Sequence, residues 1–125
     1  MMGVTPKEAA QTLWPLGLTA IGANCGEGIE VMEPVLTQMR AALEPDASFG
    51  DESRPPCGMK QPALIAKPNA GLPRLVDGET VFDLEPAELA AHVPCFIEWG
   101  ARIVGACCGS SPEHIAAIAA VVAAV

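Results

Sequence analysis

The sequence predicts an α/β fold built on a parallel sheet. Short apolar runs at residues 18–23, 63–66 and 102–106 are typical of buried strands. Longer segments between these runs carry helix-start signals or apolar residues at helical spacing. The connections are long enough to bring successive strands back in parallel, so the expected order is α-β-α-β-α-β-α.

The first helix is predicted over residues 5–16. Thr5 can cap it, Pro6 occupies the first turn where its missing N–H costs nothing, and Glu8 can complete a capping box. Gly17 ends the helix, and Pro15 implies a distorted last turn.

The second helix is predicted from an apolar stripe within residues 27–43. Pro34 weakens the middle of this segment, so the helix is expected to begin near Glu33. Residues 44–61 are rich in Pro, Gly, Ser and charge and indicate a long surface loop, and a Gly/Pro-rich stretch covers residues 69–83.

The last two helices follow the second and third strands. One begins near Glu85 and ends before Gly100, with a kink expected at Pro94. The other begins at Ser110-Ser111-Pro112 and is rich in alanine.

Composition excludes several functional classes. The formal charge of −8 argues against binding to nucleic acid or to an anionic membrane. No segment is as long and apolar as a membrane span, and the N-terminus does not resemble a signal peptide, so a cytoplasmic protein is expected. In that compartment the five cysteines are reduced thiols, metal ligands or redox groups rather than a disulfide framework.

A short internal sequence similarity predicts that three of the cysteines lie close together. Residues 17–25 (GLTAIGANC) align without gaps on residues 100–108 (GARIVGACC). In both pieces a helix stop precedes a strand that ends at cysteine. Because the carboxyl ends of parallel strands open on one face, Cys25, Cys107 and Cys108 are expected on the same rim.

Three thiolates on one rim suit a tetrahedral zinc site with an open fourth position, which is typical of catalytic sites. Regular strand geometry would point Cys107 and Cys108 in opposite directions, so the backbone must turn there, and Gly109 permits the turn. Buried inert thiols and a redox-active vicinal pair are the alternatives. Cys57 and Cys95 are interpreted as ordinary thiols.

Two histidines are weaker candidates for a ligand or a general base. His92 is expected on a helix face and His114 in the first turn of the last helix, and neither has a ligand partner nearby in the sequence. Asn69 follows the second strand and so belongs to the same rim as the cysteines, although Asn beside Gly also suits a plain turn.

Three segments carry a resemblance to a known family: residues 21–25 (IGANC), 66–73 (AKPNAGLP) and 103–115 (IVGACCGSSPEHI). In this order they resemble the zinc-dependent homocysteine S-methyltransferases, which include the homocysteine domain of cobalamin-dependent methionine synthase and the betaine-using enzymes. The chain departs from the family pattern at Ala106, where glycine is usual, and at Ser110-Ser111, where threonines are usual. Its 44–61 loop is longer than usual.

The resemblance implies a (β/α)₈ barrel of which residues 1–125 form the C-terminal portion, roughly strands six to eight with their helices. It implies zinc ligands at Cys25, from the sixth strand, and at Cys107 and Cys108, from the eighth. It also implies substrate contacts at Asn24 and Asn69, the latter supplying oxygen to the metal while substrate is absent. Family barrels need about 250 residues, so a fragment or one half of a split enzyme is expected.

The function implied is zinc-dependent methyl transfer to the thiol of homocysteine or a similar small thiol, giving methionine. Two alternatives stay open: an inactive zinc- or thiol-binding barrel fragment, and a vicinal-dithiol redox or soft-metal-binding protein. The implied partners are the N-terminal part of the barrel or a corrinoid protein, and the sequence does not specify the methyl donor.

Overall fold

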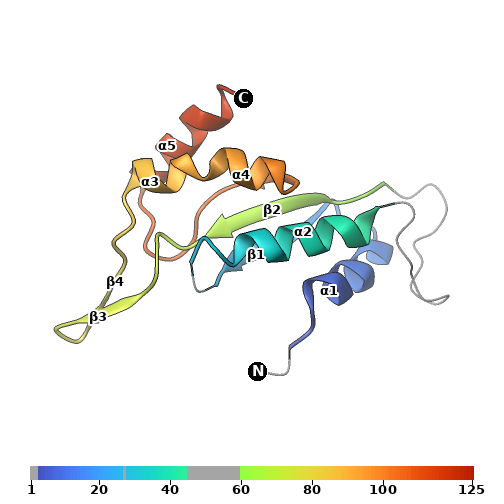
Figure 1. Ribbon diagram of the computed structural model, residues 1–125, viewed down its shortest axis with the longest axis horizontal. Coiled ribbons are helices and arrows are strands. Elements are labelled where there is room, and N and C mark those ends of the chain that lie inside the picture. The colour runs from blue at the N-terminus through green and yellow to red at the C-terminus, as the bar shows by residue number, and fades with distance from the viewer. Residues whose placement is uncertain (1–2, 27, 45–59) are drawn as a thin grey trace.

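The computed structural model describes residues 3–26, 28–44 and 60–125, which form one α/β unit (Figure 1). Its elements in chain order are α1 (Pro6–Leu13), the 3₁₀ turn η1 (Trp14–Leu16), β1 (Ala20–Cys25), α2 (Met32–Leu43), β2 (Ala63–Pro68), β3 (Arg74–Val76), β4 (Glu79–Val81), α3 (Pro86–Ala91), α4 (Val93–Glu98), β5 (Ala101–Val104) and α5 (Pro112–Val122).

The main sheet confirms the predicted parallel α/β class. Its strand order is β1-β2-β5, and both neighbouring pairs are parallel. β1 and β2 pair without a break from Ala20 opposite Ala63 to Cys25 opposite Pro68. A bulge between Leu64 and Ile65 interrupts the pairing of β2 with β5. The three strands therefore end at one edge, which we call the carboxyl rim.

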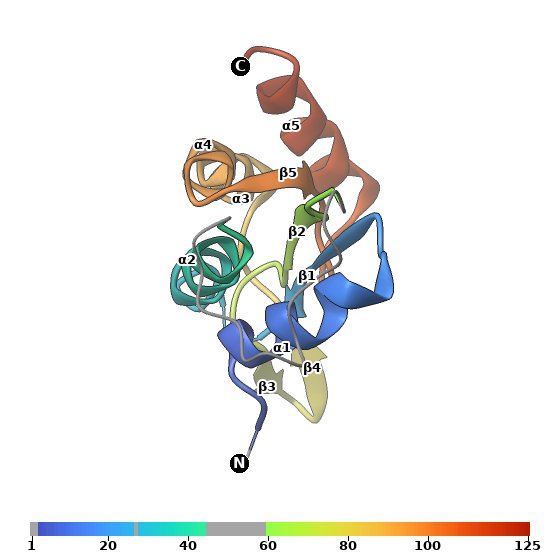
Figure 2. The same ribbon diagram turned by 90° about the vertical axis from the view of Figure 1, so that its right-hand side faces the viewer.

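The helices cover one face of the sheet and leave the other open. α2 packs on β1 and β2, α4 packs on β5, and α1 lies against α2; Figure 2 shows α2 and α4 on the same side of the sheet. Leu64 and Ala66 of β2 point into this layer and are buried, whereas Lys67, on the opposite face, is exposed. The centre of the core is formed by Phe96, Met32, Leu36, Leu89 and Val93.

Local sequence explains the ends of the first helix. Thr5 caps α1 and forms the complete capping box with Glu8, as predicted. Pro15 falls in η1, where the α-helix has tightened to a 3₁₀ turn, and Gly17 then adopts a left-handed φ of 74° that ends the segment.

Three features differ from the sequence-based expectation. β1 covers Ala20–Cys25 rather than residues 18–23, so Cys25 is itself the last strand residue. The kink predicted at Pro94 is a full break: the helix expected over residues 85–99 is two helices that meet at His92, because Pro94 lacks the N–H that would continue α3. Within the Gly/Pro-rich stretch, β3 and β4 form an antiparallel hairpin that the sequence pattern did not predict.

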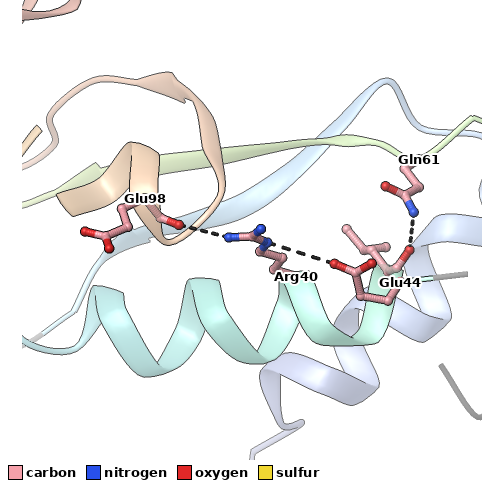
Figure 3. Close-up of polar contacts among 5 residues, drawn as sticks. Arg40, Glu44, Gln61 and Glu98 are labelled. Atoms are coloured by element: carbon pink, nitrogen blue, oxygen red, sulfur yellow. Dashed lines mark hydrogen bonds and ion pairs between the residues drawn. The ribbon is translucent and has the colours of Figure 1, made fainter. Parts of the chain in front are cut away.

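Arg40 ties α2 to α4 at the end of the sheet opposite the carboxyl rim. Its Nη1 donates to the backbone oxygen of Glu98 at 2.9 Å, and its Nε lies 4.0 Å from Oε1 of Glu44 (Figure 3). Nearby, the Gln61 amide donates to the backbone oxygen of Leu43 (Figure 3). These contacts join α2 to the end of α4 and to the segment just before β2. Among the described residues, no helix has the length and apolar composition needed to cross a membrane.

Candidate metal centre

Three cysteine sulfurs converge at the carboxyl rim. The Sγ atom of Cys25 lies 2.9 Å from that of Cys107 and 3.9 Å from that of Cys108, and the Cys107 and Cys108 sulfurs are 3.9 Å apart. Cys25 and Cys107 are partly buried and Cys108 is exposed. Within the described parts of the chain, this is the group of three or more Cys, His, Asp or Glu side chains with the spacing of a metal site.

The backbone at Cys25 is bent to direct its thiol toward this group. Strand alternation would place Cys25 with Ile21 and Ala23, on the helix-covered face. Instead Cys25 has a φ of +60°, a left-handed conformation that is uncommon for any residue with a side chain. Its sulfur consequently lies 3.1 Å from the amide nitrogen of Asn24, which belongs to the open face. Strain of this kind, costing about 1–3 kcal/mol, is concentrated at functional sites.

The turn predicted after Cys107 and Cys108 is present. β5 ends at Val104, and the Cys107 N–H then donates to the Pro68 oxygen at 2.8 Å. Gly109 has a φ of +76°, and a Cβ atom placed there would lie 2.2 Å from Cγ of Phe82. Phe82, which follows the hairpin, therefore packs directly on the turn that brings the two thiols together.

Within the cluster, the Cys25 thiol is a hydrogen-bond donor and the Cys107 sulfur is its acceptor. The pKa of Cys107 is lowered to about 7, first because the Cys25 thiol donates to it and then because Asn24 Nδ2 lies 3.7 Å from its sulfur. The pKa of Cys25 is raised, chiefly because its proton is shared with Cys107. Cys107 is thus the first of this pair to become a thiolate, the form that binds metals.

Asn69 joins the loop after β1 to the turn after β5. Its side chain is buried, with 5% exposed. Nδ2 donates to the backbone oxygen of Gly26 at 3.1 Å, and Oδ1 accepts from the backbone N–H of Cys108 at 3.2 Å. In this arrangement Asn69 contacts the backbone on both sides of the cluster, at Gly26 and at Cys108.

The donor set fits zinc. Tetrahedral coordination with Zn–S bonds of about 2.3 Å requires sulfurs about 3.8 Å apart. Two of the three separations are 3.9 Å, and the third, between Cys25 and Cys107, needs a widening of about 1 Å. Three thiols leave one position of a tetrahedral site for another ligand.

The other candidates lie apart from the cluster. His114 is buried in the first turn of α5, where Nδ1 accepts from the Ser111 N–H at 3.0 Å and Nε2 donates to the Leu84 oxygen at 2.8 Å. Both ring nitrogens are therefore used in holding α5 in place. His92 stacks on Phe96, and Cys95 is a free thiol on α4. Cys57 lies outside the described residues.

The role of Phe82 was not predicted from the sequence. Its segment carries no motif, and its contact with Gly109 joins residues 27 positions apart. The contact depends on the hairpin geometry, for which the sequence offered no periodic signal.

Fold and site together define an α/β protein with a cluster of three thiols at the carboxyl ends of parallel strands. The family model described as homocysteine S-methyltransferase matches residues 1–122. The chain belongs to this family, as its resemblance had indicated.

The similar proteins are named as methionine synthases or as betaine–homocysteine S-methyltransferases. Methionine synthase from Mycobacterium leprae is 34% identical over 124 residues, and its counterpart from Mycobacterium tuberculosis is 34% identical over 125 residues; in each case 98% of this chain and 9% of the relative are covered. Betaine–homocysteine S-methyltransferase 1 from Danio rerio is 30% identical over 125 residues, covering 95% of this chain and 30% of that protein. The chain thus spans less than a third of the length of these relatives.

Proposed function

We propose that the chain forms the zinc-binding part of an enzyme that methylates the thiol of homocysteine, giving methionine. The observation that carries the proposal is the convergence of the Cys25, Cys107 and Cys108 sulfurs to within 3.9 Å of one another at the carboxyl rim. Membership of the homocysteine S-methyltransferase family supports the substrate. The relatives' names differ in whether a donor is stated, so the donor stays unassigned.

The three thiolates would hold the zinc, and Asn24 and Asn69 would maintain their positions. A zinc ion bound there lowers the pKa of a substrate thiol enough to remove its proton. The residues of the chain contribute in three ways. The Asn24 amide lies beside two sulfurs. Asn69 joins the residue after Cys25 to the turn that carries Cys108. The open face of the sheet gives a thiol access to the rim.

Metal analysis of cysteine variants tests the proposal. We expect about one zinc per chain, and we expect Cys25→Ser, Cys107→Ser and Cys108→Ser each to lose it, because thiolates supply most of the affinity of such sites. Cys95→Ser is the matched control, since that free thiol lies on α4 away from the cluster. Full zinc retention in Cys25→Ser would remove that residue from the site.

A thiol redox protein is the second candidate, and the 2.9 Å separation of the Cys25 and Cys107 sulfurs favours it. The same metal analysis separates the two. A redox protein is expected to purify without stoichiometric zinc and to lose two thiols reversibly on oxidation. The methyltransferase site is expected to bind zinc and to protect all three cysteines from alkylation.

We also propose that the chain is the later portion of a (β/α)₈ barrel whose other strands come from a separate segment. In the described sheet, β1 and β5 each pair on one side only. Ile103, on the open face, is 46% exposed. Family barrels need about 250 residues, and unpaired edges beside exposed apolar side chains favour association.

Sedimentation and hydrogen exchange test this second proposal. The chain alone is expected to self-associate or to show weak protection of β1, β2 and β5, and to lack methyltransferase activity. A monodisperse monomer with strongly protected strands would show that it is self-sufficient. Homocysteine methylation by that monomer would refute the fragment interpretation.

A further inference from the structure

Lys67 is the cation that the sheet places nearest the thiol cluster. β1 has no basic residue, β2 has Lys67 and β5 has Arg102. Arg102 lines a cavity of about 490 Å³ at the opposite end of the strands, together with Arg40 and Gln61. Lys67 lies one residue before Pro68, the strand partner of Cys25.

The Lys67 side chain lies across the open face of the sheet. It is the register partner of Asn24, whose amide contacts the sulfurs of Cys25 and Cys107. A Cβ atom placed on Gly105 would lie 3.4 Å from Cγ and 3.6 Å from Cε of Lys67. The aliphatic part of the lysine therefore runs alongside Gly105, two residues before Cys107, and Gly105 leaves room for it.

The charge of Lys67 has no partner among the described residues. The side chain is exposed, and no described carboxylate lies within 4.0 Å of its ammonium group. Arg74, by contrast, is paired with Asp83 at 2.7 Å. On the same face of the sheet, two residues before Lys67 along β2, lies Ile65, and its partners on the neighbouring strands are Gly22 and Ile103. These three residues form an apolar surface.

We propose that Lys67 binds the carboxylate of the thiol substrate and so selects thiols that carry an acid group. This inference rests on the proposed function, because it assumes that the substrate sulfur sits at the cluster. Neighbouring strands are about 4.8 Å apart, so a sulfur held beside Asn24 places a short carboxylate tail within reach of the next strand. Hydrogen bonds between an ammonium and a carboxylate are stronger than neutral ones and favour that orientation.

Binding of two thiols to the cobalt(II)-loaded full chain tests the inference, with the thiolate-to-metal absorption band as the readout. Homocysteine and 3-aminopropane-1-thiol share the thiol and the amine, but the second lacks the carboxylate. We expect Lys67→Met to weaken homocysteine binding about tenfold and to change the affinity for 3-aminopropane-1-thiol less than twofold. Lys67→Arg is expected to restore most of the homocysteine affinity, and Lys60→Met, which removes an exposed charge before β2, is expected to behave as wild type.

The possible outcomes separate the carboxylate role of Lys67 from the thiol site itself. If both thiols weaken equally in Lys67→Met, or if homocysteine affinity is unchanged, the carboxylate role of Lys67 is wrong while the thiol site stands. If the unaltered chain takes up no cobalt, the proposed function fails and the Lys67 inference fails with it; if it takes up cobalt but binds neither thiol, the Lys67 inference alone is wrong. Lys67→Gln provides a second neutral variant, so loss of metal by Lys67→Met does not block the comparison.

Discussion

The Oδ1 atom of Asn69 accepts a hydrogen bond from the backbone N–H of Cys108 at 3.2 Å. The Nδ2 atom of the same side chain donates to the oxygen of Gly26, directly after Cys25. One buried amide therefore links the loop after β1 to the turn after β5. This link relates Cys25 and Cys108, which lie 83 positions apart in the chain.

Asn69→Ala is expected to lower both stability and zinc affinity. The substitution leaves the Cys108 N–H and the Gly26 oxygen without their partner. Each of these groups that no water molecule reaches costs about 1–3 kcal/mol. Supporting residues of this kind typically change metal affinity about 10–100-fold. Urea denaturation and competition with a chromophoric chelator measure the two effects. Asn69→Asp keeps the acceptor toward Cys108, so it is expected to fall between Asn69→Ala and wild type; zinc affinity equal to wild type in Asn69→Ala would mean that Asn69 is only a turn residue.

Gly109→Ala is expected to weaken zinc binding by disturbing the turn that carries Cys107 and Cys108. The left-handed φ of +76° costs about 1–2 kcal/mol for a residue with a Cβ atom. Overlap with Phe82 adds about 1–3 kcal/mol. Gly78→Ala is a matched control because Gly78 has a φ of +86° but no atom within 4 Å of the position that the added methyl group would occupy. Equal losses of stability in the two variants would show that the Phe82 contact contributes nothing.

Gly22→Ala is expected to force β1 and β2 apart. A Cβ atom at Gly22 would lie 2.1 Å from the backbone oxygen of Ile65, so a strand must shift, at a cost of about 1–3 kcal/mol or more. The loss is measured as a lower urea midpoint together with faster exchange of β1 amides. Gly3→Ala, where no atom lies within 4 Å, is expected to leave both unchanged. A Gly22→Ala variant as stable as wild type would contradict the close approach of the two strands.

In the zinc-free, reduced protein, alkylation of Cys107 is expected to rise as pH increases through about 7. A lowered pKa means that the reactive thiolate persists to lower pH than for an ordinary thiol. Cys25, whose pKa is raised, is expected to react only at higher pH. Iodoacetamide labelling with peptide mass spectrometry measures both rates. Asn24→Ala removes one of the hydrogen-bond donors and should move the Cys107 profile upward; a profile unmoved by that change would exclude a role of Asn24 in the cluster.

The sequence by itself determined the parallel α/β class, the approximate positions of the three parallel strands and the meeting of three cysteines. Periodic apolar runs and capping residues such as Thr5 act locally, and parallel strands bring their carboxyl ends to one edge. The similarity between residues 17–25 and 100–108 was therefore enough to predict that Cys25 lies on the same rim as Cys107 and Cys108. It also required a turn at Gly109, which the structure has.

Tertiary structure alone decided how the thiols are held. The left-handed backbone of Cys25, the bridge made by Asn69 and the packing of Phe82 on Gly109 depend on contacts between distant segments. The β3–β4 hairpin was likewise fixed by strand pairing rather than by a periodic pattern. The physical reason is that propensity and periodicity act over a few neighbouring residues, whereas these hydrogen bonds and van der Waals contacts exist only once the chain has folded.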